Sequence, residues 1–184
     1  MSAAPMLIVV AGPPGSGKTT LAHKIAAALG CPAICRDEIK EGMARTADGF
    51  IAGPGDELTV RTLPVFFGAL DLLIRAGVTT VAEAAFQDRI WRLGLEPLID
   101  VAELRIAHCI VGADLAFRRS LRRGKDNPVR SAHADPDPSD KAEWTKRHAD
   151  FQRPALDAPW IEVDTTSGYR PTLPEIVAFA AGTS

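Results

Sequence analysis

Cysteine and long apolar runs are both scarce in this sequence, and each scarcity excludes a class of protein. The 184 residues include three cysteines, Cys31, Cys35 and Cys109, which are too few and too irregularly spaced for a disulfide framework. Cys31 and Cys35 amount at most to half of a metal site, and no second half follows. No apolar stretch approaches the roughly 20 residues of a membrane span. We therefore expect reduced thiols in a cytoplasmic protein that does not contact a membrane.

A surplus of charge of one sign is also missing. The chain carries 21 Lys and Arg against 23 Asp and Glu, a net charge of −2, which provides no global attraction to nucleic acid or anionic lipid. The short apolar run near the N-terminus has no charged region before it and ends in glycines, unlike a signal peptide. A hydrophobic fraction of 46 % and a charged fraction of 24 % are ordinary for a globular protein. The length suits one domain over residues 1–184.

Apolar runs alternate with amphipathic segments along the whole chain. The pattern predicts strands over 6–11, 33–35, 78–83, 104–111 and 160–164. It predicts helices over 18–29, 36–43, 58–76, 89–102, 114–123, 141–157 and 173–181. We expect Pro64 to bend or restart its helix, Pro97 to interrupt the next one, and Asp114 to cap the fifth. Strands separated by helices predict an α/β fold with a five-stranded parallel sheet and helices on both faces.

The segment between the first predicted strand and helix matches G-x-x-x-x-G-K-[ST] in full. Its residues are Gly12, Pro13, Pro14, Gly15, Ser16, Gly17, Lys18 and Thr19, with Thr20 next. Glycines let the backbone turn its N–H groups toward phosphate oxygens, and the N-terminus of the helix adds a partial positive charge. We expect Lys18 to reach the β- and γ-phosphates of ATP and the Thr19 hydroxyl to bind Mg²⁺. The motif therefore predicts a P-loop NTPase fold with nucleotide at residues 12–20.

A carboxylate follows the second predicted strand, in Cys35-Arg36-Asp37-Glu38. The carboxyl ends of strands in such a sheet open on the crevice where ligands bind. Asp37 comes first after the strand and can accept the proton of an attacking hydroxyl, which predicts a general base. The alternative is that Asp37 only caps the short helix after it. The two roles are compatible.

A third cluster is basic: Arg118, Arg119, Arg122, Arg123, Lys125 and Arg130 fall within one short stretch. On a helix Arg119, Arg122 and Arg123 share a face, from which guanidinium groups can stabilise phosphoryl transfer. We expect residues from about 118 to 140 to form a lid, in which Arg122 and Arg130 face the substrate. The alternative is a solvated basic face, and Arg118 is the expected bystander because it lies off the shared face.

The P-loop, the Arg36-Asp37 segment and the arginine helix resemble the small P-loop kinases of the chloramphenicol phosphotransferase and zeta-toxin type, and the kinase domain of phage polynucleotide 5′-hydroxyl kinase. The resemblance implies a general base at Asp37 and a contact between Lys40 and a substrate phosphate. It also implies an R-x-x-x-R pair at Arg119 and Arg123, with one arginine along the adenine and the other on the phosphates. The loop over residues 163–169 would pass the adenine through backbone atoms.

The remaining expectations concern the acceptor. Glu83 ends the third predicted strand, where it serves the magnesium shell, orients Lys40 or the substrate, or is structural. The acceptor-binding segment is expected over residues 40–76, which has no row of aromatics for stacking bases. We expect an ATP- and Mg²⁺-dependent kinase of a small hydroxyl compound (a nucleoside, sugar or antibiotic), acting as a monomer or homodimer. The alternatives are a kinase of nucleic-acid 5′-hydroxyls or nucleotide sugars, with nucleic acid the less favoured partner, and a P-loop switch that is not a kinase.

Overall fold

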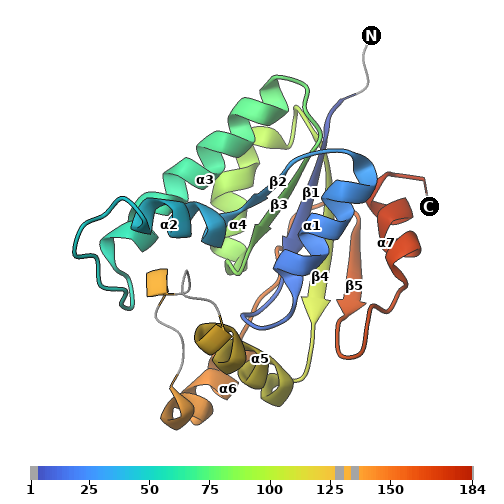
Figure 1. The fold of residues 1–184 in the computed structure, drawn as a ribbon. Coiled ribbons are helices and arrows are strands. Elements are labelled where there is room, and N and C mark those ends of the chain that lie inside the picture. The colour runs from blue at the N-terminus through green and yellow to red at the C-terminus, as the bar shows by residue number, and fades with distance from the viewer. Residues whose placement is uncertain (1–3, 127–130, 134–136, 184) are drawn as a thin grey trace.

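A five-stranded parallel sheet forms the centre of the computed structural model, which describes residues 4–126, 131–133 and 137–183 (Figure 1). The strands are β1 (Met6–Ala11), β2 (Ala33–Cys35), β3 (Thr80–Ala84), β4 (Glu103–Ile110) and β5 (Trp160–Asp164), in the order β2-β3-β1-β4-β5. All four pairings are parallel. The predicted α/β P-loop fold is confirmed.

Helices connect the strands and cover both faces of the sheet. They are α1 (Lys18–Leu29), α2 (Arg36–Ala44), α3 (Glu57–Arg75), α4 (Asp88–Leu95), α5 (Ala113–Asp126), α6 (Lys141–Ala149) and α7 (Leu173–Ala180). Short 3₁₀ segments, η1 (Glu96–Leu98) and η3 (Pro138–Asp140), precede β4 and α6. Within the described residues, no helix is both long and apolar enough to cross a membrane.

Alternating side chains of β1 serve two separate cores. Ile8 and Val10 pack with the residues of α1 and α7 on one face. Leu7 and Val9 pack with those of α3 and α4 on the other face, as the two helix layers in Figure 1 show. This placement explains why β1 is a continuous apolar run, since a central parallel strand is buried on both sides.

Four sequence-based expectations about the elements were wrong. Helix α3 runs unbroken through Pro64, because Pro64 lies on the exposed side while Phe66 and Leu70 anchor the helix in the core. Asp114 is not a cap but the second residue of α5, which begins at Ala113. Helix α5 also continues to Asp126, and α6 ends at Ala149, well before residue 157.

The register of the sheet brings three strand ends together. Glu83 of β3 is paired with Val10 of β1 on one side and with Cys35 of β2 on the other. The P-loop follows β1 and the Arg36-Asp37 pair follows β2. Glu83 is therefore flanked by the segment predicted to bind the nucleotide and the segment predicted to supply the general base.

Candidate active site

The P-loop adopts a backbone that favours glycine at defined positions. Gly17 caps α1 with φ of 78°, a left-handed conformation that other residues rarely adopt. At Gly12 a Cβ atom would lie 2.6 Å from the carbonyl oxygen of Cys109, which leaves no room for a side chain. The loop between them wraps over the N-terminus of α1, where backbone N–H groups bind anions.

Lys18 and Thr19 both contact Glu83. The Lys18 Nζ lies 3.5 Å from Glu83 Oε1, and the Thr19 hydroxyl donates to Glu83 Oε2 at 3.1 Å. Lys18 and Glu83 are only 6 % and 2 % exposed. Burial raises the pKa of Glu83, although the charge of Lys18 opposes that rise. Of the roles considered for Glu83, these contacts favour one at the P-loop over the orientation of Lys40.

The P-loop residues fit a nucleotide with Mg²⁺. The Ser16 Oγ is buried without a hydrogen-bond partner among the described residues, and a buried polar atom of this kind calls for a ligand. The Thr19 hydroxyl uses its hydrogen on Glu83 and keeps its oxygen lone pairs for a cation. Thr19 and Glu83 are thus the residues that would hold Mg²⁺, directly or through water, beside the phosphates.

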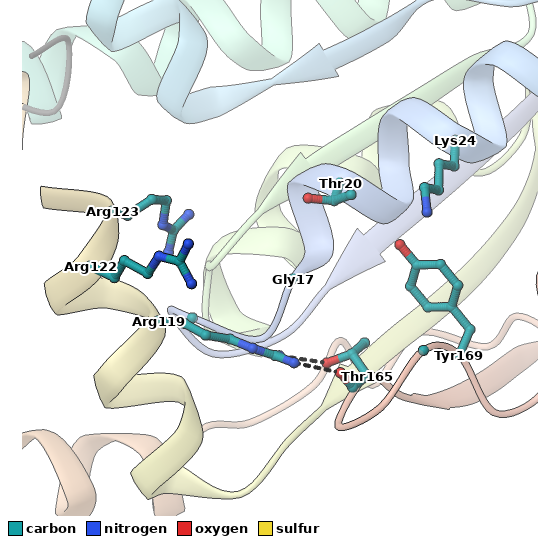
Figure 2. A pocket seen from close by; sticks show the side chains of 10 residues that line it. Gly17, Thr20, Lys24, Arg119, Arg122, Arg123, Thr165 and Tyr169 are labelled. Atoms are coloured by element: carbon teal, nitrogen blue, oxygen red, sulfur yellow. Dashed lines mark hydrogen bonds between the residues drawn. The ribbon is translucent and has the colours of Figure 1, made fainter. Parts of the chain in front are cut away.

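A cavity of about 480 Å³ opens beside the P-loop (Figure 2). Figure 2 shows three arginines of α5 on one side of it, and Lys24 and Tyr169 on the other. Its lining residues are Gly15, Gly17, Thr20, Lys24, Arg119, Arg122, Arg123, Thr165, Gly168 and Tyr169. Lys24 and Tyr169 were not foreseen as part of this site. The two side chains are in contact, with the Lys24 Nζ 4.9 Å from the centre of the Tyr169 ring.

Arg119 is hydrogen-bonded to the loop after β5. Its guanidinium donates to the Thr165 hydroxyl at 3.3 Å and to the carbonyl oxygens of Thr165 at 2.8 Å and Thr166 at 3.3 Å. The same Thr165 hydroxyl donates to the carbonyl of Ser16 at 2.7 Å. These bonds join α5, the P-loop and the loop after β5 around the cavity. Arg118 is exposed and does not line it, and Arg130 lies outside the described residues.

Asp37 lies one residue inside α2, where Cys35 is the N-cap, so the capping alternative is wrong. It accepts a hydrogen bond from Arg36 Nη1 at 3.0 Å. Burial alone would raise the pKa of Asp37, but the charges of His133, Lys18 and Arg36 hold it well below its usual range. Asp37 is therefore ionised at neutral pH and within the electrostatic reach of the P-loop lysine.

A second cavity, of about 370 Å³, begins at Asp37. Its polar lining is Arg36, Asp37 and Thr59, and its apolar lining is Val60, Leu63, Ala85, Phe86 and Ile90. The α3 residues fall in the acceptor segment expected over 40–76. The residues from 85 to 90 were not foreseen, although Ala85 and Phe86 directly follow the strand that carries Glu83.

The comparisons with known proteins agree with this geometry. The profile of the AAA domain family matches residues 7–154. The chain belongs to this AAA domain family. A protein named shikimate kinase from Corynebacterium efficiens is 28 % identical over 134 residues, which are 72 % of each chain.

Solved structures share the fold of this AAA domain. A proposed kinase from Chloroflexus aurantiacus J-10-fl superposes with a TM-score of 0.86 and 22 % identity over 99 % of this chain and 100 % of that one. A sugar kinase from Janibacter sp. HTCC2649 superposes with a TM-score of 0.65 and 21 % identity over 96 % and 95 % of the two chains.

Lys40, which was expected to contact a substrate phosphate, is buried in an ion pair with Asp56. Its Nζ is bonded to Asp56 Oδ2 at 2.7 Å and to the Thr59 hydroxyl at 2.8 Å, and the residue is 2 % exposed. It lines neither cavity described above. We correct the expected contact: burial against Asp56 makes Lys40 part of a structural ion pair that ties α2 to the start of α3.

One contact of the segment expected to form a lid was not foreseen in the sequence analysis. His133 lies 3.2 Å from Glu41 Oε1 of α2, although 92 residues separate them. No local sequence pattern links His133 to an acid 92 residues away. The contact places residues 131–133 beside α2, the helix that carries Asp37 (Figure 1).

Proposed function

We propose that this AAA domain is an ATP- and Mg²⁺-dependent kinase that transfers the γ-phosphoryl group to a hydroxyl of a small molecule. The observation that supports it best is the position of Lys18. The P-loop lysine pairs with Glu83 and lowers the pKa of Asp37, so one cation links the nucleotide loop to a carboxylate at the mouth of a second cavity. A switch protein needs neither such a carboxylate nor an acceptor cavity.

The proposed roles follow from these contacts. Lys18 and the P-loop amides would bind the β- and γ-phosphates, and Thr19 with Glu83 would hold Mg²⁺. The bound MgATP supplies the phosphoryl group and neutralises part of its charge. Asp37 would orient the acceptor hydroxyl and take its proton, which its ionised state at neutral pH permits.

The arginines of α5 would act on the nucleotide. Arg119 is held against the loop after β5 and would lie along the adenine, while Arg123 would contact the phosphates. Arg122 lines the same nucleotide cavity and not the one at Asp37, which favours a nucleotide contact over the expected substrate contact. These roles are the ones implied by the resemblance to the chloramphenicol phosphotransferase, zeta-toxin and polynucleotide kinases, a narrower group than the AAA domain family. The names of the shikimate kinase and sugar kinase relatives support a small-molecule acceptor.

A mass-spectrometric screen tests the proposal. The protein is incubated with ATP, Mg²⁺ and pooled nucleosides, sugars, hydroxylated antibiotics and 5′-hydroxyl oligonucleotides, and products about 80 Da heavier than an acceptor are sought. The Asp37→Asn variant should lose the product, whereas Asp100→Asn, at an exposed position remote from both cavities, should keep it. No product from any pool, with ATP binding intact, would contradict the kinase function.

A further inference from the structure

We infer that the acceptor is an alcohol with a compact, largely apolar body, and not a sugar or a polyanion. The inference rests on the proposed function, since it treats the cavity at Asp37 as the acceptor site. That cavity has one polar end, formed by Asp37, Arg36 and Thr59. Its remaining walls are the apolar side chains of α3, α4 and the segment after β3.

The apolar side chains that line the cavity are exposed to water, and a bound molecule would cover them. Val60 and Leu63 lie three residues apart on α3, so both side chains point from the same face of the helix. Val60 is 64 % exposed, and Phe86 and Ile90 across the cavity are only half-buried. A ligand that removes these side chains from water gains about 25 cal/mol for each Å² of apolar surface covered. A ligand with an apolar body gains this free energy on binding, whereas a hydrated sugar does not.

The hydrogen-bonding groups of the cavity are confined to its one polar end. Arg36 donates from Nη1 to Asp37 and from Nη2 to the Thr59 carbonyl, and its buried Nε has no partner among the described residues. The Thr59 hydroxyl already accepts a bond from Lys40 at 2.8 Å. A hexose would bring hydroxyls around its whole ring, and those that meet the apolar walls would be buried without a hydrogen-bond partner, which is unfavourable. One hydroxyl at Asp37, with one further oxygen near Arg36, matches what the lining offers.

The charge of the cavity disfavours an anionic acceptor. Lys40, the residue expected to bind a substrate phosphate, is neutralised by Asp56 and lines neither cavity described above. Arg36 is paired with Asp37, which itself repels an anion. A volume of about 370 Å³ lies at the small end of ligand pockets, which suits a single ring or a short chain more than a polymer.

The test compares matched acceptors and matched variants. Phosphoryl transfer from ATP is measured with benzyl alcohol and cyclohexylmethanol, and with glucose, ribose and thymidine. We expect kcat/KM to be at least tenfold higher for the apolar alcohols. Val60→Asn should lower that value about tenfold, as loss of a favourable apolar contact does, and leave the KM for ATP unchanged. Val65→Asn, the same change on the exposed part of α3 away from the cavity, should have no effect.

The outcomes distinguish a failure of the inferred apolar acceptor from a failure of the proposed kinase function. Faster transfer to glucose, ribose or thymidine, insensitive to Val60→Asn, would overturn the apolar acceptor while the kinase function stands. If no acceptor is phosphorylated, ligand-observed NMR measures binding of the two apolar alcohols to the same variants. Binding that Val60→Asn abolishes and Val65→Asn preserves supports the apolar site without kinase activity, and absence of binding overturns it.

Discussion

Replacing Asp56 by asparagine tests whether Lys40 is a structural residue. The side chains of Lys40 and Asp56 are 3 % and 8 % exposed, and the variant would leave the ammonium buried without its carboxylate. Asparagine is as good an N-cap as aspartate, so the bond from the Thr59 N–H that starts α3 can persist. The substitution therefore keeps the cap and removes the ion pair, together with the bond that the Gly53 N–H donates to the same Asp56 oxygen.

The size of the effect follows from the pKa of Asp56. Burial alone would raise this pKa, but the bonds from Lys40, Thr59 and Gly53 lower it from 3.8 to about 2. A difference of nearly two pKa units corresponds to about 2 kcal/mol of folding free energy. Removing one partner of a fully buried pair costs about 3–5 kcal/mol, and the Thr59 hydroxyl that stays on Lys40 reduces that penalty. We expect Asp56→Asn to lose about 2–3 kcal/mol, or roughly 5–10 °C in Tm.

Urea unfolding at several pH values is the measurement. A lowered pKa contributes stability above the unfolded value near 3.8, and that contribution fades as the pH falls toward 2. The gap between the parent protein and Asp56→Asn should be constant above about pH 5 and about half as large at pH 3. Asp71→Asn, which breaks an exposed pair with Arg75 on the same helix, should cost at most about 0.5 kcal/mol.

Two results would refute the reasoning. One is an Asp56→Asn protein no less stable than Asp71→Asn, and the other is a stability gap that does not change with pH. Lys40→Met combined with Asp56→Asn should recover part of the loss, because no buried charge is then left unpaired. If Lys40 instead contacts substrate, Lys40→Met would raise the acceptor KM and leave the stability unchanged.

The remaining predictions concern the nucleotide and the base. Asp37→Asn should lower kcat about a hundredfold and leave the Kd for ATP unchanged in equilibrium binding; full activity would refute the base. Arg119→Ala should raise the Kd for ATP about tenfold in the same binding assay, and Arg118→Ala, on the exposed side of α5, should not. Protonation of Glu83, whose pKa is raised by burial, should lower kcat/KM as the pH falls, and at a higher pH than an unperturbed carboxyl would. The Glu83→Gln variant should be less active, and its kcat/KM should fall less steeply as the pH is lowered. An unchanged dependence on pH would refute this assignment.

The elements that the sequence predicted best are those whose signals are local. The bounds of β1, α1, β2 and β5 match the expected ranges residue for residue. Strand β1 is a continuous apolar run that ends at Gly12, and α1 lies between Gly17 and Gly30. The P-loop was also recognisable, since its backbone requires glycine in a fixed spacing. Helix α3 was misread at Pro64 because its continuity depends on Phe66 and Leu70 packing under it, which a local rule does not contain.

The contacts that escaped prediction are those between distant segments. The contact between Lys40 and a substrate phosphate was expected from the resemblance to the polynucleotide kinase, and no local pattern links Lys40 to Asp56, 16 residues later. His133 and Glu41 are 92 residues apart, and no pattern couples them. The apolar acceptor wall likewise joins α3 to α4 across the end of β3. Such sites arise from topology, which places sequentially remote strand ends and helices side by side.

The corrected role of Lys40 bears on catalysis as well as on folding. Lys40 belongs to α2, the helix that carries Asp37, and Asp56 begins α3, the helix that carries Thr59 and Val60. Lys40 bonds Thr59 directly, so this ion pair sets the position of the base relative to one wall of the acceptor cavity. General-base transfer requires hydrogen-bond reach between Asp37 and the acceptor hydroxyl, and a shift near 1 Å can cost about a hundredfold in rate. Well below its Tm, Asp56→Asn should therefore lower kcat for the acceptor while the Kd for ATP stays the same, although Asp56 lines neither cavity.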